Sequence, residues 1–329
     1  MYRPGRLRKS PALRKLAAQA HLNPSNLIMP YFVCAGKKIR QPIKSLPGIF
    51  RLSEDEVLKD VENLKHSGIN AIILFGIPRD KDDKATSAYD EKGVIQKTVL
   101  SLKKNFKEEL VVITDVCLCG YTKHGHCGIL KKSKLQVKIK NFYIDNNKTL
   151  EILTKTALSH ARAGADIVAP SAMMDGQVDA IRRGLDANGF EDTAIMGYSA
   201  KFASNFYGPF REVADSAMKF GDRKSYQMDF RNSAQALREI ELDIQEGADI
   251  VMVKPALCYL DIIAKAKEKF SLPLAAFNVS AEYAMVKGYA QGNQETEKAL
   301  ALEVLTAIKR AGADIIISYW AKHAAGWLK

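Results

Sequence analysis

The stretch IQEGADIVMVKP, residues 244–255, joins the end of a helical pattern, a glycine and a run of apolar residues. Similar phrases are HSGINAIILFG at 66–76, HARAGADIVAPS at 160–171 and IKRAGADIIISYW at 308–320. Each phrase predicts an amphipathic helix that ends at the glycine and leads into a buried strand. Nearly continuous apolar strands between helices are typical of a parallel sheet that is covered on both faces.

Eight strands are expected along the chain, at 28–33, 70–75, 110–116, 166–170, 193–198, 249–253, 273–278 and 313–319. Their alternation with helices predicts an α/β fold, in which residues 28–329 form a single (β/α)8 or TIM barrel. The alternative is an open doubly wound sheet, but no Gly-x-Gly-x-x-Gly motif follows any of these strands. Residues 1–27 are basic, contain three prolines and are expected to form an arm outside the barrel.

Composition and charge indicate a globular protein of a reducing cytoplasm. Apolar residues make up 47% of the 329, and the longest apolar runs are only as long as strands, so no signal peptide or membrane span is expected. The net charge of +12 invites a nucleic-acid interpretation. Because much of the basic excess is dispersed and no nucleic-acid-binding motif accompanies it, a solvated basic surface is favoured, with no nucleic-acid partner.

The C-terminal ends of the strands, where barrel enzymes carry their active sites, are unusually polar. The residues expected there are Asp115 and a cysteine cluster after the third strand, Ser171 after the fourth, Lys201 just past the fifth, Lys254 at the end of the sixth, Ser280 after the seventh and Tyr319 at the end of the eighth. Their accumulation on one rim predicts an active site.

Two of these rim residues are lysines on adjacent strands. Lys254 follows four strand-core residues and precedes Pro255, and Lys201 lies among small and apolar residues. Burial and a second ammonium group both lower the pKa of a lysine, and a neutral amine can form a Schiff base with a ketone. The alternative is that each lysine is a solvated or salt-bridged surface group.

The cysteine cluster lies in DVCLCGYTKHGHCG, residues 115–128. Cys117, Cys119 and Cys127 provide three thiolates and leave one position open, which favours a catalytic zinc over a structural zinc site. The spacing is not that of a Cys-x-x-Cys redox pair, and three buried thiols are the remaining alternative. His124 and His126 are interpreted as a fourth ligand or as groups that support the ligands.

A long polar and aromatic segment at 206–232 separates the fifth and sixth strands and predicts a lid or binding loop. Arg211 and Arg223 in this segment could each bind a carboxylate through two parallel hydrogen bonds. The alternative, which the sequence does not exclude, is that they form ion pairs with Asp215, Asp222 or Asp229. Elsewhere, the isolated Cys34 and Cys258 are interpreted as small buried residues.

Six motifs in order, DVCLCGYTKHGHCG, APSAMMDG, YSAKFASNFYGPFRE, GDRKSYQMD, EGADIVMVKPAL and NVSAEYAM, resemble the porphobilinogen synthase family, also called delta-aminolevulinic acid dehydratase. The resemblance extends over nearly the whole chain. It implies a cytoplasmic lyase of tetrapyrrole (heme) biosynthesis that condenses two 5-aminolevulinate molecules into porphobilinogen with loss of two waters. It also implies a (β/α)8 barrel whose N-terminal arm wraps a neighbouring subunit in a homo-octamer.

The resemblance assigns roles to individual residues. Lys254 would form the Schiff base with the first substrate, and Ser280 and Tyr319 would bind the carboxylate of that substrate. Lys201 would engage the second substrate, whose pocket would be formed by Arg211, Arg223, Asp115, Ser171 and Gln177, with Phe210 and Gln227 as further substrate-binding residues. The three cysteines would make it a zinc-dependent type, and Glu239 would be the carboxylate for an allosteric Mg²⁺ at a subunit interface.

The sequence departs from the family pattern at a few places. Ala172 stands where Asp is usual, Ala281 where Gly is usual and Asn278 where Gln is common. Residues 130–143 are longer and richer in lysine than the resemblance leads one to expect, and are interpreted as part of a lid whose charge attracts the anionic substrate.

Two other functions remain as alternatives. Another Schiff-base barrel enzyme, such as a class I aldolase or transaldolase, would need only one of the lysines and no three-thiol loop. A zinc-containing nucleic-acid binder would account for the positive charge but leave the lysines at the rim without a role.

Overall fold

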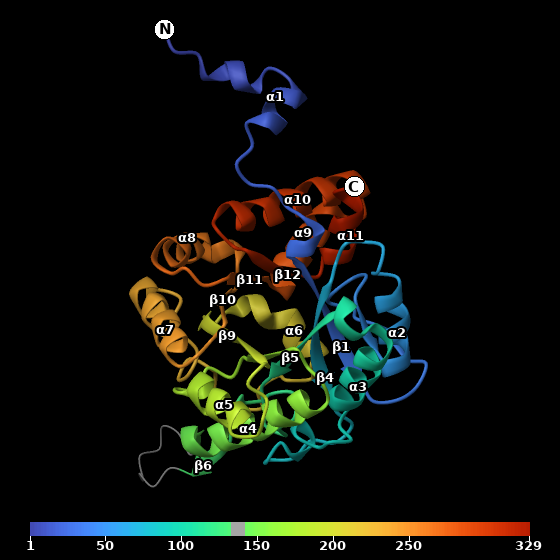
Figure 1. Ribbon diagram of the computed structural model, residues 1–329, viewed down its shortest axis with the longest axis vertical. Coiled ribbons are helices and arrows are strands. Elements are labelled where there is room, and N and C mark those ends of the chain that lie inside the picture. Colours follow the sequence, from blue (N-terminus) through green and yellow to red (C-terminus); the bar gives the residue numbers. More distant parts are fainter. Residues whose placement is uncertain (133–141) are drawn as a thin grey trace.

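Eight parallel strands close into a barrel in the computed structural model, which describes residues 1–132 and 142–329 (Figure 1). In order around the barrel, the strands are β1 (Leu27–Cys34), β4 (Ala71–Ile77), β5 (Val111–Val116), β8 (Ile167–Pro170), β9 (Ala194–Lys201), β10 (Ile250–Lys254), β11 (Leu274–Asn278) and β12 (Ile315–Ser318). Pairing of β12 with β1 closes the ring. The predicted (β/α)8 barrel is confirmed, and the open doubly wound sheet is excluded.

Helices surround the barrel (Figure 1). They are α2 (Glu54–Glu62), α3 (Val94–Phe106), α4 (Asn146–Arg162), α5 (Gln177–Asp186), α7 (Ser233–Gln245), α8 (Leu260–Lys269), α9 (Ser280–Ala290), α10 (Gln294–Arg310) and α11 (Ala321–Trp327). The short helix α6 (Gly208–Val213) belongs to the segment after β9, between the 3₁₀ turn η5 (Asn205–Tyr207) and α7. Three further 3₁₀ turns in the barrel domain are η3 (Thr86–Ala88), η4 (Lys107–Glu109) and η6 (Leu257–Tyr259).

The three Gly-Ala-Asp phrases share one structure at the N-terminal end of the barrel. Their glycines, which end α4, α7 and α10, have positive φ: Gly164 (97°), Gly247 (98°) and Gly312 (120°). The aspartate that follows each glycine accepts a hydrogen bond from a backbone N–H of the neighbouring strand: Asp166 from Val112 (2.8 Å), Asp249 from Ile195 (2.7 Å) and Asp314 from Leu274 (2.9 Å). The phrase therefore ends a helix and also fixes the next strand against its neighbour.

Short strands extend the architecture at two places. β3 (Phe50–Leu52) pairs in parallel with β1 and antiparallel with β2 (Arg40–Pro42). β6 (Leu130–Lys132) pairs antiparallel with β7 (Phe142–Ile144), just after the cysteine cluster. The central part of the lysine-rich segment 130–143, on which the predicted charged lid depends, lies outside the described residues.

Residues 1–23 precede the barrel and extend away from it (Figure 1). They contain the 3₁₀ turn η1 (Pro4–Arg8) and the helix α1 (Pro11–Leu16), in neither of which is any residue buried, and the turn η2 (Pro24–Asn26) leads into β1. The side chains of Leu7 and Leu16 are 57% and 83% exposed. The division into an arm (1–27) and a barrel domain (28–329), and contact of the arm with a neighbouring subunit, stay predictions.

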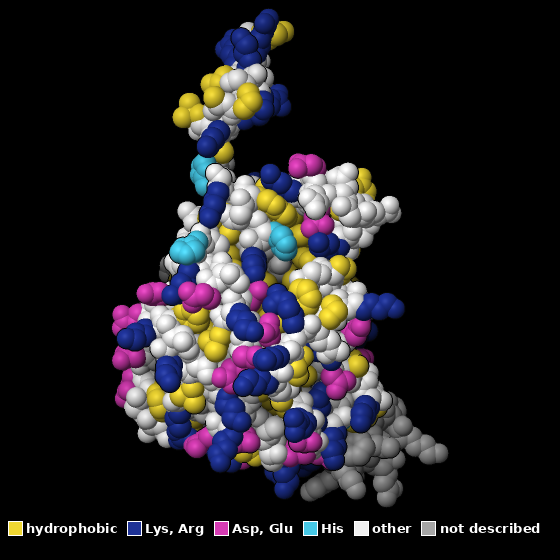
Figure 2. Space-filling view, turned by 90° about the vertical axis from the view of Figure 1, so that its right-hand side faces the viewer, with side chains coloured by type: hydrophobic (Ala, Val, Ile, Leu, Met, Phe, Trp, Pro, Cys, Tyr) yellow, Lys and Arg dark blue, Asp and Glu magenta, His cyan; other side chains and the backbone are white. Residues whose placement is uncertain are grey.

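Basic and acidic side chains alternate over the face of the barrel shown in Figure 2, whereas the arm carries mainly basic ones. On that face the positive charge is thus spread over the barrel rather than gathered into one patch. None of the helices in the described ranges has an apolar stretch of the length that a membrane crossing needs.

Candidate active site

Lys201 and Lys254 lie side by side at the C-terminal ends of β9 and β10, where they are partners in the strand register. Lys201 was expected just past its strand and is instead its last residue. Both side chains are buried, at 5% exposure each. The structure thus brings the two predicted lysines together inside the barrel mouth and excludes the alternative that they are solvated surface groups.

A β-bulge in β9 directs Lys201 into this site. Gly197 pairs with Val251 and Ala200 with Val253, so Tyr198 and Ser199 together lie opposite one residue of β10. Residues 198 and 201 of a regular strand would face opposite sides. Here the bulge turns both inward, and the ring of Tyr198 lies 5.5 Å from Nζ of Lys201.

Lys254 is enclosed by aromatic rings. Its Nζ atom lies 4.1 Å from the ring centroid of Phe277 and 5.0 to 5.4 Å from those of Tyr198, Phe210 and Tyr207. Burial, together with the charge of Lys201, lowers the pKa of Lys254 to about 7. A substantial fraction of this amine is therefore neutral at neutral pH and able to attack a carbonyl carbon.

Asp115 and Ser171 flank Lys201 at the ends of β5 and β8. Lys201 donates a hydrogen bond from Nζ to the carbonyl oxygen of Ser171. Burial raises the pKa of Asp115 to about 6, although the hydroxyl of Ser171 and the ammonium of Lys201 act in the opposite direction. Both predicted pocket residues are thus placed at the second lysine, and the carboxyl of Asp115 is poised to gain or lose a proton near neutral pH.

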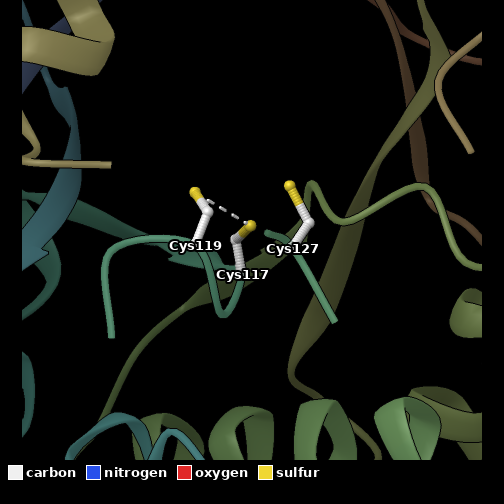
Figure 3. Close-up of side chains that lie close together, drawn as sticks. All are labelled: Cys117, Cys119 and Cys127. Carbon is white, nitrogen blue, oxygen red and sulfur yellow. Dashed lines mark hydrogen bonds between the residues drawn. The ribbon is translucent and has the colours of Figure 1, made fainter. Parts of the chain in front are cut away.

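Cys117, Cys119 and Cys127 converge on one point beside the lysines (Figure 3). Their sulfur atoms lie within 4.8 Å of one another, and those of Cys117 and Cys119 are 3.4 Å apart. Tetrahedral zinc with bonds of about 2.3 Å requires sulfur atoms about 3.8 Å apart, so the three thiols fit a zinc ion. Hydrogen bonds from Cys117 and Cys119 hold the pKa of Cys127 well below its ordinary value, with Arg223 as a further cause.

The two histidines of this loop stay outside the sulfur cluster in the part of the chain that the structure describes. Nδ1 of His124 accepts a hydrogen bond from the backbone N–H of His126 at 3.1 Å. The ring of His126 contacts Tyr226 and the carbonyl oxygen of Phe220. Of the two interpretations, supporting groups rather than a fourth ligand agrees with these positions.

Neither arginine of the segment after β9 pairs with an aspartate in residues 1–132 and 142–329. Arg211 donates a hydrogen bond to the carbonyl oxygen of Ser204, and Arg223 donates to those of Gly125 and Ser216. The predicted alternative partners are engaged elsewhere or exposed: Asp215 binds Lys81, and Asp229 binds Arg231. Both arginines therefore keep guanidinium donors available to an anion.

These arginines line a cavity of about 450 Å³. Its other walls include Gln227, Phe206, Met218 and Tyr259. The side-chain amide of Gln227 is buried and neither of its polar atoms has a partner among the described residues. A buried amide without partners and two cationic groups suit a small ligand that carries a carboxylate.

The side chain of Gln177 is bonded to the protein backbone and is not free to bind a ligand with both of its polar atoms. It is the first residue of α5, and its side-chain amide bonds with the backbone of Met174 (3.2 Å) and Pro170 (3.3 Å). The side chain therefore shapes the loop between β8 and α5, beside Ser171, and it also borders a second cavity, of about 230 Å³.

Glu239 lies on α7 at this second cavity, away from the lysines. Asp175 and Asp243 line the same cavity. Burial raises the pKa of Glu239, and it raises that of Asp243 to about 7. Asp229 lines the cavity as well, so four carboxyl groups gather there, while the magnesium role of Glu239 stays a prediction.

Ser280 and Tyr319 lie near the aromatic wall of Lys254. The hydroxyl of Ser280 accepts a hydrogen bond from the N–H of Phe210 and donates one to the carbonyl oxygen of Phe206. The hydroxyl of Tyr319 is buried and has no partner within the described ranges. Phe210 packs over Phe32 and Phe75 as well as Lys254. A ligand carboxylate at Ser280 would compete with the backbone of residues 206–210.

The three departures from the family pattern are buried or partly buried. The amide of Asn278 bridges Ser318 (2.9 Å) and Glu282 (2.9 Å), so it joins the ends of β11 and β12 to α9. Ala172 is fully buried next to Ser171, and Ala281 is the second residue of α9.

The interpretation of the isolated cysteines is wrong for one of them. Cys258 is exposed and borders the arginine cavity, because it lies in the turn η6 after β10 rather than in a strand. Cys34 is half-buried at the end of β1.

Sequence reasoning did not single out Tyr198, Tyr207, Phe277 or Tyr226, which surround Lys254 or hold the cysteine loop. Tyrosine and phenylalanine are common in any core, and their positions beside a lysine depend on strand pairing and on a bulge. The sequence signal that could have found the tyrosines is their place in the motifs of the site: Tyr198 and Tyr207 lie in the same motif as Lys201, and Tyr226 lies in the same motif as Arg223.

The closed barrel and the charged, buried groups at its C-terminal rim define a (β/α)8-barrel enzyme. The chain belongs to the delta-aminolevulinic acid dehydratase family, whose sequence profile matches residues 1–327.

Individual relatives extend this match over the full length. A delta-aminolevulinic acid dehydratase of Archaeoglobus fulgidus is 55% identical over 320 residues, which are 97% of this chain and 96% of the relative. One of Synechococcus elongatus is 51% identical over 327 residues, 99% and 98% of the two chains. The crystal structure of delta-aminolevulinic acid dehydratase (porphobilinogen synthase) from Toxoplasma gondii ME49, in complex with the reaction product porphobilinogen, is 44% identical, with a TM-score of 0.94 and coverage of 99% and 91%.

Proposed function

We infer that the protein condenses two molecules of 5-aminolevulinate into porphobilinogen with loss of two waters, an early step of tetrapyrrole (heme) biosynthesis. The observation that carries this conclusion is the register pairing of two buried lysines beside three clustered thiols. Each substrate contains a ketone, an amine and a carboxylate. The site offers amines for ketones, and arginines and hydroxyls for carboxylates.

Lys254 binds the first substrate. Its neutral Nζ attacks the ketone carbon, and loss of the carbonyl oxygen as water leaves a Schiff base. The aromatic wall of Phe277, Tyr198 and Phe210 excludes water from this bond. The hydroxyl of Tyr319, which is buried without a partner among the described residues, is a donor for the substrate carboxylate, together with that of Ser280.

Lys201 engages the second substrate. Arg211, Arg223 and Gln227 bind its carboxylate from the cavity that they line. Asp115 and Ser171 hold the ammonium of Lys201 in place, and Asp115 is positioned to exchange a proton near neutral pH. Because the two lysines lie on neighbouring strands, the two substrate molecules are held next to each other. This proximity favours formation of the bonds that join the two molecules.

Zinc is proposed at Cys117, Cys119 and Cys127. When bound there, zinc would act as a Lewis acid toward the second substrate or a bound water. The low pKa of Cys127 favours a thiolate ligand, and the buried positions of all three sulfurs favour a retained ion.

The proposal further includes that the protein is cytoplasmic, forms a homo-octamer and binds an allosteric Mg²⁺. Glu239 would be the Mg²⁺ ligand, supported by Asp175 and Asp243 in the same cavity. The exposed leucines of the arm support its role as an oligomer contact, because apolar side chains on an isolated segment are stabilised when a partner covers them.

The purified protein, supplied with zinc and 5-aminolevulinate, tests this function. We expect a pyrrole that gives colour with an acidic aldehyde reagent and has the mass of porphobilinogen. The variant Lys254→Ala should give none. A zinc-loaded, folded protein that forms no pyrrole would reject the function and reopen the aldolase alternative, whereas nucleic acid binding is expected only at low salt.

A further inference from the structure

The cysteine loop, residues 117–128, is in contact with the segment 205–228 that covers the two lysines, here called the lid. The side-chain contacts between them are buried or half-buried, and they involve the backbone or side chains of residues 125–127. The contacts join the segment that carries the proposed zinc ligands to the segment that carries Arg211 and Arg223.

A chain of hydrogen bonds joins the two segments through His126 and Tyr226. Nε2 of His126 lies 3.0 Å from the carbonyl oxygen of Phe220, which only accepts, so Nε2 carries the proton. In the neutral ring Nδ1 is then an acceptor, and it receives the hydroxyl proton of Tyr226 at 3.2 Å. The oxygen of Tyr226 in turn accepts the backbone N–H of Cys127 at 3.4 Å. The chain therefore runs from a cysteine backbone to the lid backbone with every donor and acceptor matched.

Backbone contacts support the same junction. The N–H of Lys219 donates to the carbonyl oxygen of His124 at 3.2 Å, and Arg223 donates to that of Gly125 at 2.9 Å. Gly125 has a φ of 75°, and a Cβ there would lie 2.4 Å from the carbonyl oxygen of Ala217. Glycine is thus needed at this position both for its backbone conformation and for the close approach of the lid.

Both ends of the lid are fixed at the strands that carry the lysines. Tyr207 donates its hydroxyl proton to the carbonyl oxygen of Lys254 at 3.0 Å, and the N–H of Met228 donates to the carbonyl oxygen of Lys201 at 3.1 Å. The remaining side-chain ion pair of the lid, between Lys81 and Asp215, is exposed at the aspartate and contributes little. The buried and half-buried attachments of the lid are therefore the lysine strands, Ser280 with the aromatic wall around Phe210, and the cysteine loop, of which only the cysteine loop carries the proposed metal ligands.

We propose that His126 and Tyr226 couple the metal site to the lid, so that zinc bound to the three cysteines holds the lid closed over the lysines, and the closed lid in turn strengthens zinc binding. The inference rests on the zinc site of the proposed function. Metal ligation fixes the backbone of residues 117–127. This backbone carries the carbonyl oxygens of His124 and Gly125 and the N–H of Cys127, to which the lid is hydrogen-bonded. Because coupling between two sites is reciprocal, a change in either segment must appear in the other.

Tyr226→Phe is the variant that tests the coupling, since it removes one oxygen and keeps the ring. We expect zinc affinity, measured by competition with a chromophoric chelator, to fall by about 10-fold, as for other groups that support metal ligands. In hydrogen-exchange mass spectrometry, zinc should protect the backbone amides of residues 216–228 in the wild-type protein and much less in the variant. Tyr289→Phe, at an exposed tyrosine of α9, is the control and should match the wild type.

Gly125→Ala gives a second, independent test, because its Cβ pushes on Ala217 and leaves His126 and Tyr226 unchanged. It should deprotect residues 216–228 even with zinc bound. If the wild-type protein binds zinc but the hydrogen exchange of residues 216–228 is the same with and without zinc, the coupling is overturned and the metal site is not. An unaltered zinc affinity of Tyr226→Phe would have the same meaning. A wild-type protein that binds no zinc would overturn both the coupling and the proposed metal site.

Discussion

Lys254 on β10 and Lys201 on β9 are partners in the strand register, with both ammonium groups inside the barrel mouth. Two like charges on neighbouring strands destabilise each other, and burial adds to the effect. The consequence is an amine at Lys254 whose pKa is about 7. The arrangement thus exchanges stability for a nucleophile at neutral pH, as functional sites often do.

The pH dependence of the first Schiff base should report this pKa. Since the neutral amine reacts, the rate of substrate adduct formation at Lys254 should rise with pH below about 7 and level off above it. In Lys201→Met the neighbouring charge is absent, so the pKa of Lys254 and the midpoint of the profile should move to higher pH. Lys104→Met, on α3 far from the site, is the control. A midpoint unchanged by Lys201→Met would show that the second lysine does not tune the first.

Zinc removal should separate the two substrate sites. Chelation, or Cys119→Ser, should abolish most porphobilinogen formation but leave adduct formation at Lys254 intact, because the amine of Lys254 reacts inside an aromatic wall that contains none of the thiols. The two readouts are pyrrole formation and the mass of the borohydride-reduced protein. Full pyrrole formation by metal-free protein would mean that the zinc has no catalytic role.

Asp249 should matter for stability and not for chemistry. Asp249→Ala leaves the N–H of Ile195 without its partner at the N-terminal end of the barrel, at a cost of about 1–3 kcal/mol. The thermal midpoint should fall, while kcat of the folded enzyme at lower temperature stays near the wild-type value. A midpoint like that of the wild type would mean that the Gly-Ala-Asp phrase is not a structural tie.

Two glycine substitutions should have opposite effects on stability. In Gly197→Ala, next to the β9 bulge, the new Cβ would lie 2.7 Å from a carboxylate oxygen of Asp243, so the thermal midpoint should fall. In Gly288→Ala, in the exposed last turn of α9, no described residue lies within 4 Å of the new Cβ, and the helix should gain at most about 0.5–1 kcal/mol. Equal midpoints for the two variants would contradict this difference.

The sequence predicted the barrel because its strands are marked locally. The apolar runs, the glycines before them and the position of Lys254 at a strand end all follow from short-range patterns, and all eight strands were confirmed. The cluster of Cys117, Cys119 and Cys127 was also predictable, because three thiols in a short loop have few alternatives.

Other features depend on contacts between distant segments. The bulge that turns Lys201 inward is a matter of pairing between β9 and β10, and no local signal marks it. The backbone bonds of Gln177 and the exposure of Cys258 depend on how loops return to the barrel. The partners of His126 lie about a hundred residues away, so the sequence left its role open.

Mapping the borohydride-trapped adduct tests the central claim most directly. The zinc-loaded protein is reduced in the presence of 5-aminolevulinate, digested and sequenced by mass spectrometry. We predict that the first adduct is on Lys254, with modification of Lys201 only as substrate occupies the second site, and that Lys254→Ala yields neither trapping nor turnover. An adduct on any other lysine while Lys254 stays unmodified, or turnover by Lys254→Ala, would contradict the account.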